Sequence, residues 1–156
     1  MIELSIDTPE QMDELGARIA RQLSAGDIVA LNGELGAGKT TLTRGLGRQL
    51  GIRGTVTSPT FVLARTHPSE SGGAPLVHVD AYRLSHPAEL DDLDIDFDGS
   101  IVVVEWASGM LDAVADQWLD VTIERPIGGA ETDDGVEART VRIEGHGARW
   151  RDVRLD

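Results

Sequence analysis

The chain has 156 residues, of which 40% are hydrophobic and 26% charged, and it contains no cysteine. These values predict one globular domain, residues 1–156, and exclude a disordered chain, a disulfide scaffold and a thiol enzyme. The formal net charge of −13 opposes direct binding to nucleic acid, so a role there would need a partner that holds the RNA. Because no apolar run could span a membrane and the first residues do not resemble a signal peptide, we expect a cytoplasmic protein.

The N-terminal segment has the pattern of a strand followed by a helix. Residues Ile2 to Ile6 alternate apolar and polar side chains, as in a strand. Thr8 is expected to cap the helix, with Pro9 in its first turn and Gln11 closing a capping box. The apolar positions that follow at helical spacing are Met12, Leu15, Ile19 and Leu23.

A glycine-rich loop follows the next predicted strand, Asp27 to Leu31. It contains Lys39, the only lysine of the chain, and it leads into a predicted helix, Lys39 to Leu50. Gly51 can end that helix in a left-handed conformation. The residues of the loop and its continuation are Gly33, Glu34, Leu35, Gly36, Ala37, Gly38, Lys39, Thr40 and Thr41.

This loop has the composition of a phosphate-binding site. Glycines allow successive backbone N–H groups to point at a phosphate, and the following helix adds the positive end of its dipole. Lys39 would reach the β- and γ-phosphates, the Thr40 hydroxyl would ligate Mg²⁺, and Thr41 would lie near the α-phosphate. Guanine-specific switch proteins recognise the base with an Asn-Lys-x-Asp element. Because the only lysine of this chain lies in the glycine-rich loop, no second lysine is left for that element, and ATP is favoured over GTP.

The remaining elements predict an α/β fold: a phosphate-loop nucleoside triphosphatase (NTPase) domain whose mixed central sheet is flanked by helices. Loops are expected at Pro68 to Pro75, where the spacing suggests an antiparallel hairpin, and at Pro126 to Val136. The expected strands are Phe61 to Arg65, Leu76 to Asp80, Ile101 to Glu105, Leu119 to Glu124 and Thr140 to Glu144, and the expected helices are Pro87 to Leu93 and Met110 to Ala115.

Two acidic residues end apolar strands. Asp80 and Glu105 should lie at the carboxyl edge of the sheet, where α/β proteins bind ligands, and both are candidate catalytic and Mg²⁺-binding groups. Residues Asp94 to Glu105 also match the calcium-loop pattern. We consider that match accidental, because Ile101 to Val104 has the β-branched composition of a buried strand and not of an exiting helix.

Other polar side chains are weaker candidates. Thr57, Ser58 or Thr60 could form a switch that senses the γ-phosphate, and a plain turn initiated by Ser58-Pro59 is the alternative. Trp106 could cover the site, and Arg139 could reach a phosphate. The four histidines are interpreted as structural, with His78 in a buried strand and His67, His86 and His146 in loops.

The chain resembles the TsaE family, also called YjeE, the ATPase component of bacterial tRNA threonylcarbamoyladenosine synthesis. The resemblance rests on four blocks in family-like order: Gly33 to Thr41, Ser58 to Phe61, His78 to Leu84 and Val104 to Trp106. The first block is generic, whereas the other three together are specific. The chain departs from the family in the acidic stretch Asp91 to Asp98, where Asp94 replaces a common glycine, and in its long Arg125 to Glu137 loop.

The resemblance implies a Mg²⁺-dependent ATPase that supports turnover of the paired TsaB and TsaD proteins on tRNAs that decode ANN codons, with tRNA bound only through those partners. It makes Lys39 the phosphate clamp and places Thr40 and Glu105 nearest Mg²⁺. Asp80 would be a metal-shell or water-orienting acid, and Thr8 would lie near the nucleotide. Two alternatives remain open: a small-molecule kinase, and a non-catalytic subunit in which nucleotide binding alone drives assembly.

Overall fold

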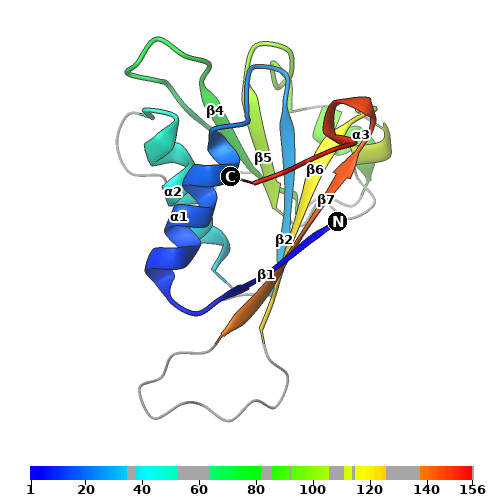
Figure 1. Ribbon diagram of the computed structural model, residues 1–156. Helices are drawn as coiled ribbons and strands as arrows, with labels where there is room; N and C mark the ends of the chain where they lie inside the picture. Colours follow the sequence, from blue (N-terminus) through cyan, green and yellow to red (C-terminus); the bar gives the residue numbers. More distant parts are fainter. Residues whose placement is uncertain are drawn as a thin grey trace.

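The computed structural model describes residues 1–34, 38–52, 64–81, 86–91, 93–105, 111–113, 115–125 and 138–155. These residues form the predicted mixed α/β fold (Figure 1). Its elements in chain order are β1 (Ile2–Ile6), α1 (Pro9–Ala20), β2 (Ile28–Gly33), α2 (Lys39–Gln49), β3 (Ala64–His67), β4 (Leu76–Asp80), α3 (Pro87–Asp91), β5 (Ile101–Glu105), the 3₁₀ turn η2 (Leu111–Ala113), β6 (Trp118–Glu124), β7 (Arg139–His146) and the 3₁₀ turn η3 (Ala148–Trp150).

The strands of the described chain form one sheet in the order β1-β7-β6-β2-β5-β4-β3. β2 pairs in parallel with both β6 and β5, and β5 pairs in parallel with β4. The pairs β1–β7, β6–β7 and β3–β4 are antiparallel, so the expected hairpin between β3 and β4 is confirmed. Because β2, β5 and β4 are parallel, their carboxyl ends meet at one edge of the sheet.

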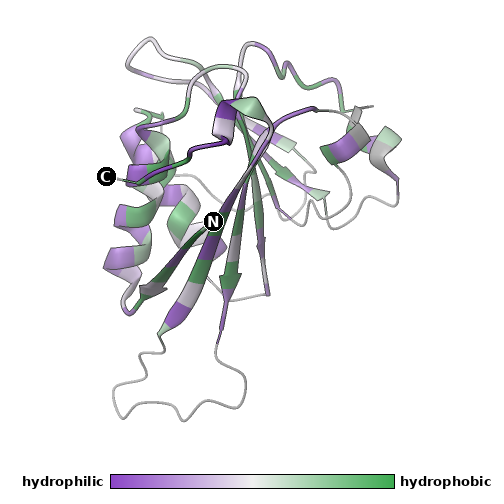
Figure 2. Ribbon diagram, turned by 45° about the vertical axis from the view of Figure 1, so that its right-hand side comes forward, coloured by the Kyte–Doolittle hydropathy of each residue, from purple (hydrophilic) through white to green (hydrophobic). Residues whose placement is uncertain are grey.

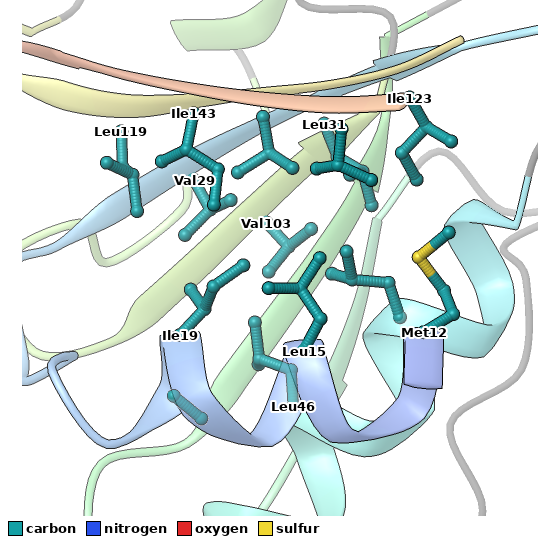
Figure 3. Close-up of a cluster of buried hydrophobic side chains, with 14 of the residues drawn as sticks. Met12, Leu15, Ile19, Val29, Leu31, Leu46, Val103, Leu119, Ile123 and Ile143 are labelled. Atoms are coloured by element: carbon teal, nitrogen blue, oxygen red, sulfur yellow. The ribbon is translucent and has the colours of Figure 1, made fainter. Parts of the chain in front are cut away.

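Two hydrophobic clusters lie on opposite faces of the sheet. α1 and α2 cover one face (Figure 1), where Leu15, Ile19 and Leu46 meet side chains of the central strands such as Val29 and Val103 (Figure 3). The other cluster joins alternate residues of β2, β4 and β5 to side chains around α3 and η2. Figure 2 shows hydrophobic and hydrophilic residues alternating along β6 and β7, as expected for strands whose two faces differ in environment.

α1 begins as the sequence predicts. Pro9 is its first residue, and the Thr8 hydroxyl accepts a hydrogen bond from the Gln11 backbone N–H at 3.1 Å. The reciprocal bond of the expected capping box is shifted, because the Gln11 side chain accepts from the backbone N–H of Asp7 at 2.7 Å and not from that of Thr8. α1 ends before Leu23, which nevertheless packs against the core.

α1 and α2 touch each other backbone to backbone. A Cβ atom added to Gly16 of α1 would lie 2.0 Å from the Leu42 carbonyl oxygen, and one added to Gly45 of α2 would lie 1.9 Å from the Asp13 carbonyl oxygen. Such distances leave no room for a side chain at either position. The two glycines therefore fix the spacing of the helices, and with it the position of the loop from which α2 emerges.

Two expected elements need correction. Within the predicted helix Met110 to Ala115, the described part has the 3₁₀ turn Leu111–Ala113, and Met110 and Val114 lie outside the described residues. α3 ends at Asp91, short of the predicted Leu93. Both segments cover the second cluster with a few apolar side chains, for which one short turn is enough.

Strand boundaries also differ between the prediction and the structure. β3 is described from Ala64 onward, and the predicted start at Phe61 lies outside the described residues. β7 extends to His146, two residues beyond the prediction, because it pairs along its length with β6. His67 and His146 therefore end strands and do not lie in loops, as the sequence had suggested.

Two backbone conformations match sequence signals. Gly51, after α2, has φ +70°, as predicted for a left-handed helix end. Asp94 has φ 55°, the only positive value at a non-glycine residue among those described. This left-handed region favours glycine, the residue that the resemblance leads one to expect at the Asp94 position. Of the helices that the structure describes, none has the length and apolar character needed to cross a membrane.

Candidate functional site

The glycine-rich loop joins β2 to α2 at the carboxyl edge of the sheet. Gly33 ends β2, and Gly38, with φ +117°, immediately precedes Lys39 at the start of α2. Glu34 is exposed, while Leu35, Gly36 and Ala37 lie outside the described residues. The strand-loop-helix context that the phosphate-binding motif requires is therefore present on both sides of the loop.

Lys39 is buried although it carries an ammonium group. Its side chain reaches back to the last residue of β2, where Nζ donates a hydrogen bond to the Gly33 carbonyl oxygen, and Lys39 is only 8% exposed. Burial lowers the pKa of Lys39 below its ordinary value of 10.5, and the carboxylates of Glu105 and Asp80 offset part of this effect. The predicted trio of Lys39, Asp80 and Glu105 thus shares one electrostatic environment.

Asp80 and Glu105 lie side by side at the ends of β4 and β5. They are register partners in the parallel pair, and Glu105 is also paired with Leu31 of β2. Asp80 is half-buried and Glu105 is 5% exposed. Both acids are on the sheet face that α1 and α2 cover, since they alternate with the valines of the opposite cluster.

His78 makes a contact that the sequence interpretation missed. Its Nε2 lies 2.9 Å from Glu105 Oε2, and the histidine is fully buried. The expected strand position was correct, but the partner comes from another strand. The signal that could have indicated it is the two-residue spacing of His78 and Asp80, which places both side chains on the same face.

Arg139 and the start of α1 also reach the loop. A Cβ atom at Gly38 would lie 3.2 Å from Arg139 Nη1 and 3.2 Å from Met12 Cε. Met12 is one helical turn after Thr8, and Arg139 is paired with Ile6 at the end of β1. Of the two weakest sequence candidates, Arg139 therefore lies beside Gly38, whereas Thr8 caps α1 one helical turn before Met12.

The hydroxyl candidates divide into two groups. Thr40 and Thr41 are half-buried in the first turn of α2, next to Lys39. The proposed switch residues Thr57, Ser58 and Thr60, together with Trp106, lie outside the described residues.

A parallel strand, a glycine-rich loop and a helix that begins at a buried lysine define an α/β fold of the phosphate-loop type. Residues 6–131 match the family model described as "Threonylcarbamoyl adenosine biosynthesis protein TsaE". The chain belongs to the TsaE family, and that family is named for tRNA threonylcarbamoyladenosine biosynthesis.

Relatives and a solved structure agree with this assignment. The chain is 55% identical over 142 residues to the protein TsaE of Streptomyces coelicolor, covering 89% of this chain and 93% of the relative. It is 48% identical over 120 residues to TsaE of Mycobacterium tuberculosis, covering 71% of each chain. The crystal structure of YdiB from Bacillus subtilis is similar with a TM-score of 0.67 at 27% identity, over 96% of this chain and 88% of that one.

Proposed function

We propose that this chain binds ATP together with Mg²⁺ at the Lys39 site and hydrolyses it. The observation that carries the proposal is a buried lysine that bonds the last residue of β2 and is influenced by the charges of the Asp80 and Glu105 carboxylates. A buried cation beside a loop rich in backbone donors suits the β- and γ-phosphates, and adjacent carboxylates suit the metal that accompanies them.

The residues present fit Mg²⁺. This ion is usually held by one or two carboxylates together with substrate phosphates and waters. Thr40, Glu105 and Asp80 would supply oxygen ligands directly or through water, and the described residues contain no group of three or more acidic, His or Cys side chains placed to hold a metal without ATP. When bound, Mg²⁺ would withdraw charge from the phosphate oxygens.

Hydrolysis would use the two acids and the two cationic side chains of the site. Asp80 or Glu105 would orient a water molecule and accept its proton as the water oxygen bonds to the γ-phosphorus. The bond from the γ-phosphorus to the bridging oxygen then breaks, and ADP leaves with the electron pair. Lys39, and Arg139 beside Gly38, would stabilise negative charge on the phosphates.

In the cell, this hydrolysis would support repeated turnover of the TsaB–TsaD complex, which transfers the threonylcarbamoyl group to tRNA. Membership of the family supports this placement. The net charge of −13 supports a division of labour in which the partner proteins, and not this chain, hold the tRNA.

Substitution of the two acids tests the catalytic assignment. Glu105→Ala and Asp80→Ala should retain ATP binding in EDTA, where Mg²⁺ plays no part, but lower phosphate release by about 100-fold or more, as the loss of a preorganised catalytic group does. Glu124→Ala is the matched control, because Glu124 also ends a parallel strand of the sheet but is exposed. An undiminished rate in both acid variants would refute the catalytic assignment of these acids, and a wild type that binds ATP without releasing phosphate would favour a nucleotide-sensing subunit. Normal ATP binding by Lys39→Ala would refute the site itself.

Partner dependence tests the biological role. Mg²⁺-dependent phosphate release is measured for the purified protein alone and after addition of the TsaB and TsaD proteins of the same organism. We expect stimulation by the pair that disappears in Glu105→Ala. A small-molecule kinase would instead stay almost silent in both conditions until its acceptor is supplied. Absence of both stimulation and co-elution would remove the tRNA-modification role and leave the ATP site.

A further inference from the structure

His78 is a fully buried histidine whose place in the site the proposed function does not explain. It lies on β4 between Val77 and Val79, and its Nε2 is 2.9 Å from Oε2 of Glu105 on the neighbouring strand. A carboxylate only accepts hydrogen bonds, so Nε2 is the nitrogen that carries the proton. The contact fixes one of the two carboxylate oxygens of Glu105 and leaves Oε1 available to the site.

The other ring nitrogen of His78, Nδ1, lowers the stability of the folded protein. His78 Nδ1 is buried and has no hydrogen-bond partner among the residues that the structure describes. A buried polar atom without a partner lowers stability, and a valine or leucine would fit this strand without that cost. Packing alone therefore does not account for an imidazole here, and the Nε2 contact with Glu105 does.

We infer that His78 is a positioning residue that holds the Glu105 carboxylate in the orientation needed toward Lys39 and Mg²⁺. The inference rests on the nucleotide site proposed above. Glu105 is itself buried, and its charge influences Lys39. Without His78 the carboxylate can rotate, because its register partners on the neighbouring strands, Leu31 and Asp80, have no side chain that donates a hydrogen bond to it. Groups that orient metal-binding side chains typically contribute 10- to 100-fold in metal affinity or activity.

Two amide substitutions that differ by one methylene group test this role. In His78→Gln the side-chain nitrogen can occupy the place of Nε2 and donate to Glu105, whereas in His78→Asn it is too short to do so. His146→Asn is the matched control, because His146 Nε2 contacts the carboxylate of Asp120 at 3.0 Å on the opposite side of β2. Thermal unfolding establishes that each variant is folded.

The readout is the affinity for ATP with Mg²⁺ and with EDTA. We expect His78→Asn to lose about 10-fold or more of the Mg²⁺-dependent gain in affinity while its binding in EDTA is unchanged. His78→Gln should restore most of that gain, and His146→Asn should equal the wild type. Equal Mg²⁺ dependence in wild type and His78→Asn, or equal losses in the Asn and Gln variants, would overturn the inference while the nucleotide site stands. A wild type that binds no ATP would instead overturn the proposed function, and this role with it.

A measurement without nucleotide examines the contact itself. The chain has four histidines, so ¹⁵N-labelled histidine gives a simple NMR spectrum. We expect the His78 ring to carry its proton on Nε2, and Glu105→Gln to shift that resonance. A proton on Nδ1, or an unaffected resonance in Glu105→Gln, would contradict the assigned hydrogen bond.

Discussion

Among single residues, Lys39 and His67 are both buried bases, but their neighbours differ. Lys39 faces the carboxylates of Glu105 and Asp80, which offset part of the effect of its burial. His67 has no such compensation: burial, followed by the influence of His78 and Arg65, lowers its pKa below the ordinary value of 6.5. Burial disfavours the charged form of both side chains. Nearby carboxylates compensate for part of this effect at Lys39, but among the described residues none does so at His67 at the end of β3.

His67 should contribute to the loss of stability in acid. Its pKa is lower in the folded protein, so as the pH falls below 6.5 the unfolded chain takes up the proton first and the free energy of unfolding decreases. The slope of the free energy of unfolding against pH between pH 7 and 5 should therefore be smaller in His67→Gln. The difference can reach about 1.4 kcal/mol per pH unit, the limit for one proton. Urea unfolding at several pH values measures it.

The control for this experiment is His86→Gln, because His86 is exposed. Its slope should equal that of the wild type. A His67→Gln slope that also equals the wild type would mean that His67 titrates alike in the folded and unfolded chain.

At the scale of elements, the contact between α1 and α2 fixes the position of the glycine-rich loop, because α2 begins at its end. Gly16→Ala and Gly45→Ala should each lower the free energy of unfolding by about 3 kcal/mol or more, since the new methyl group would overlap backbone atoms and the gain in helix propensity is only about 1 kcal/mol. Both substitutions should also weaken ATP binding, because α2 carries Lys39. Denaturant unfolding and nucleotide titration provide the two measurements.

Gly73→Ala is the control for added volume. A Cβ atom there would meet only the Ser69 hydroxyl at 3.6 Å and that of Ser71 at 3.9 Å, which are ordinary contact distances. Its stability should change by less than about 0.5 kcal/mol, as at most surface positions. Wild-type stability in Gly16→Ala would show that the helices separate without cost.

Local sequence patterns predicted the elements better than the contacts between them. The cap at Thr8, the alternation in β1 and the apolar runs of β4 and β5 are local signals, and each element was found where expected. The contact of His78 with Glu105 and the approach of Arg139 to Gly38 depend on which strands become neighbours. That choice is made by the whole sheet, so no short stretch of sequence encodes it.

At the scale of the whole molecule, the net charge of −13 should govern how partners are found. If the proposed partners, TsaB and TsaD, present a basic docking surface, the association rate constant should fall by about tenfold or more as salt is raised from about 0.05 M to 0.5 M, because screening shortens the range of attraction. Stopped-flow mixing measures this rate. Sucrose at matched osmolality is the control and should have little effect, and a rate that is independent of salt would indicate docking through uncharged surfaces.

β2 lies inside the sheet, with parallel neighbours on both sides, and the glycine-rich loop continues directly from its end. Edge strands such as β1 and β3 can detach while the rest of the fold persists, but β2 cannot be released without separating β5 from β6. The base of the loop therefore belongs to the part of the protein that opens last. Breathing motions at the sheet edges would leave the anchor of Lys39 in place.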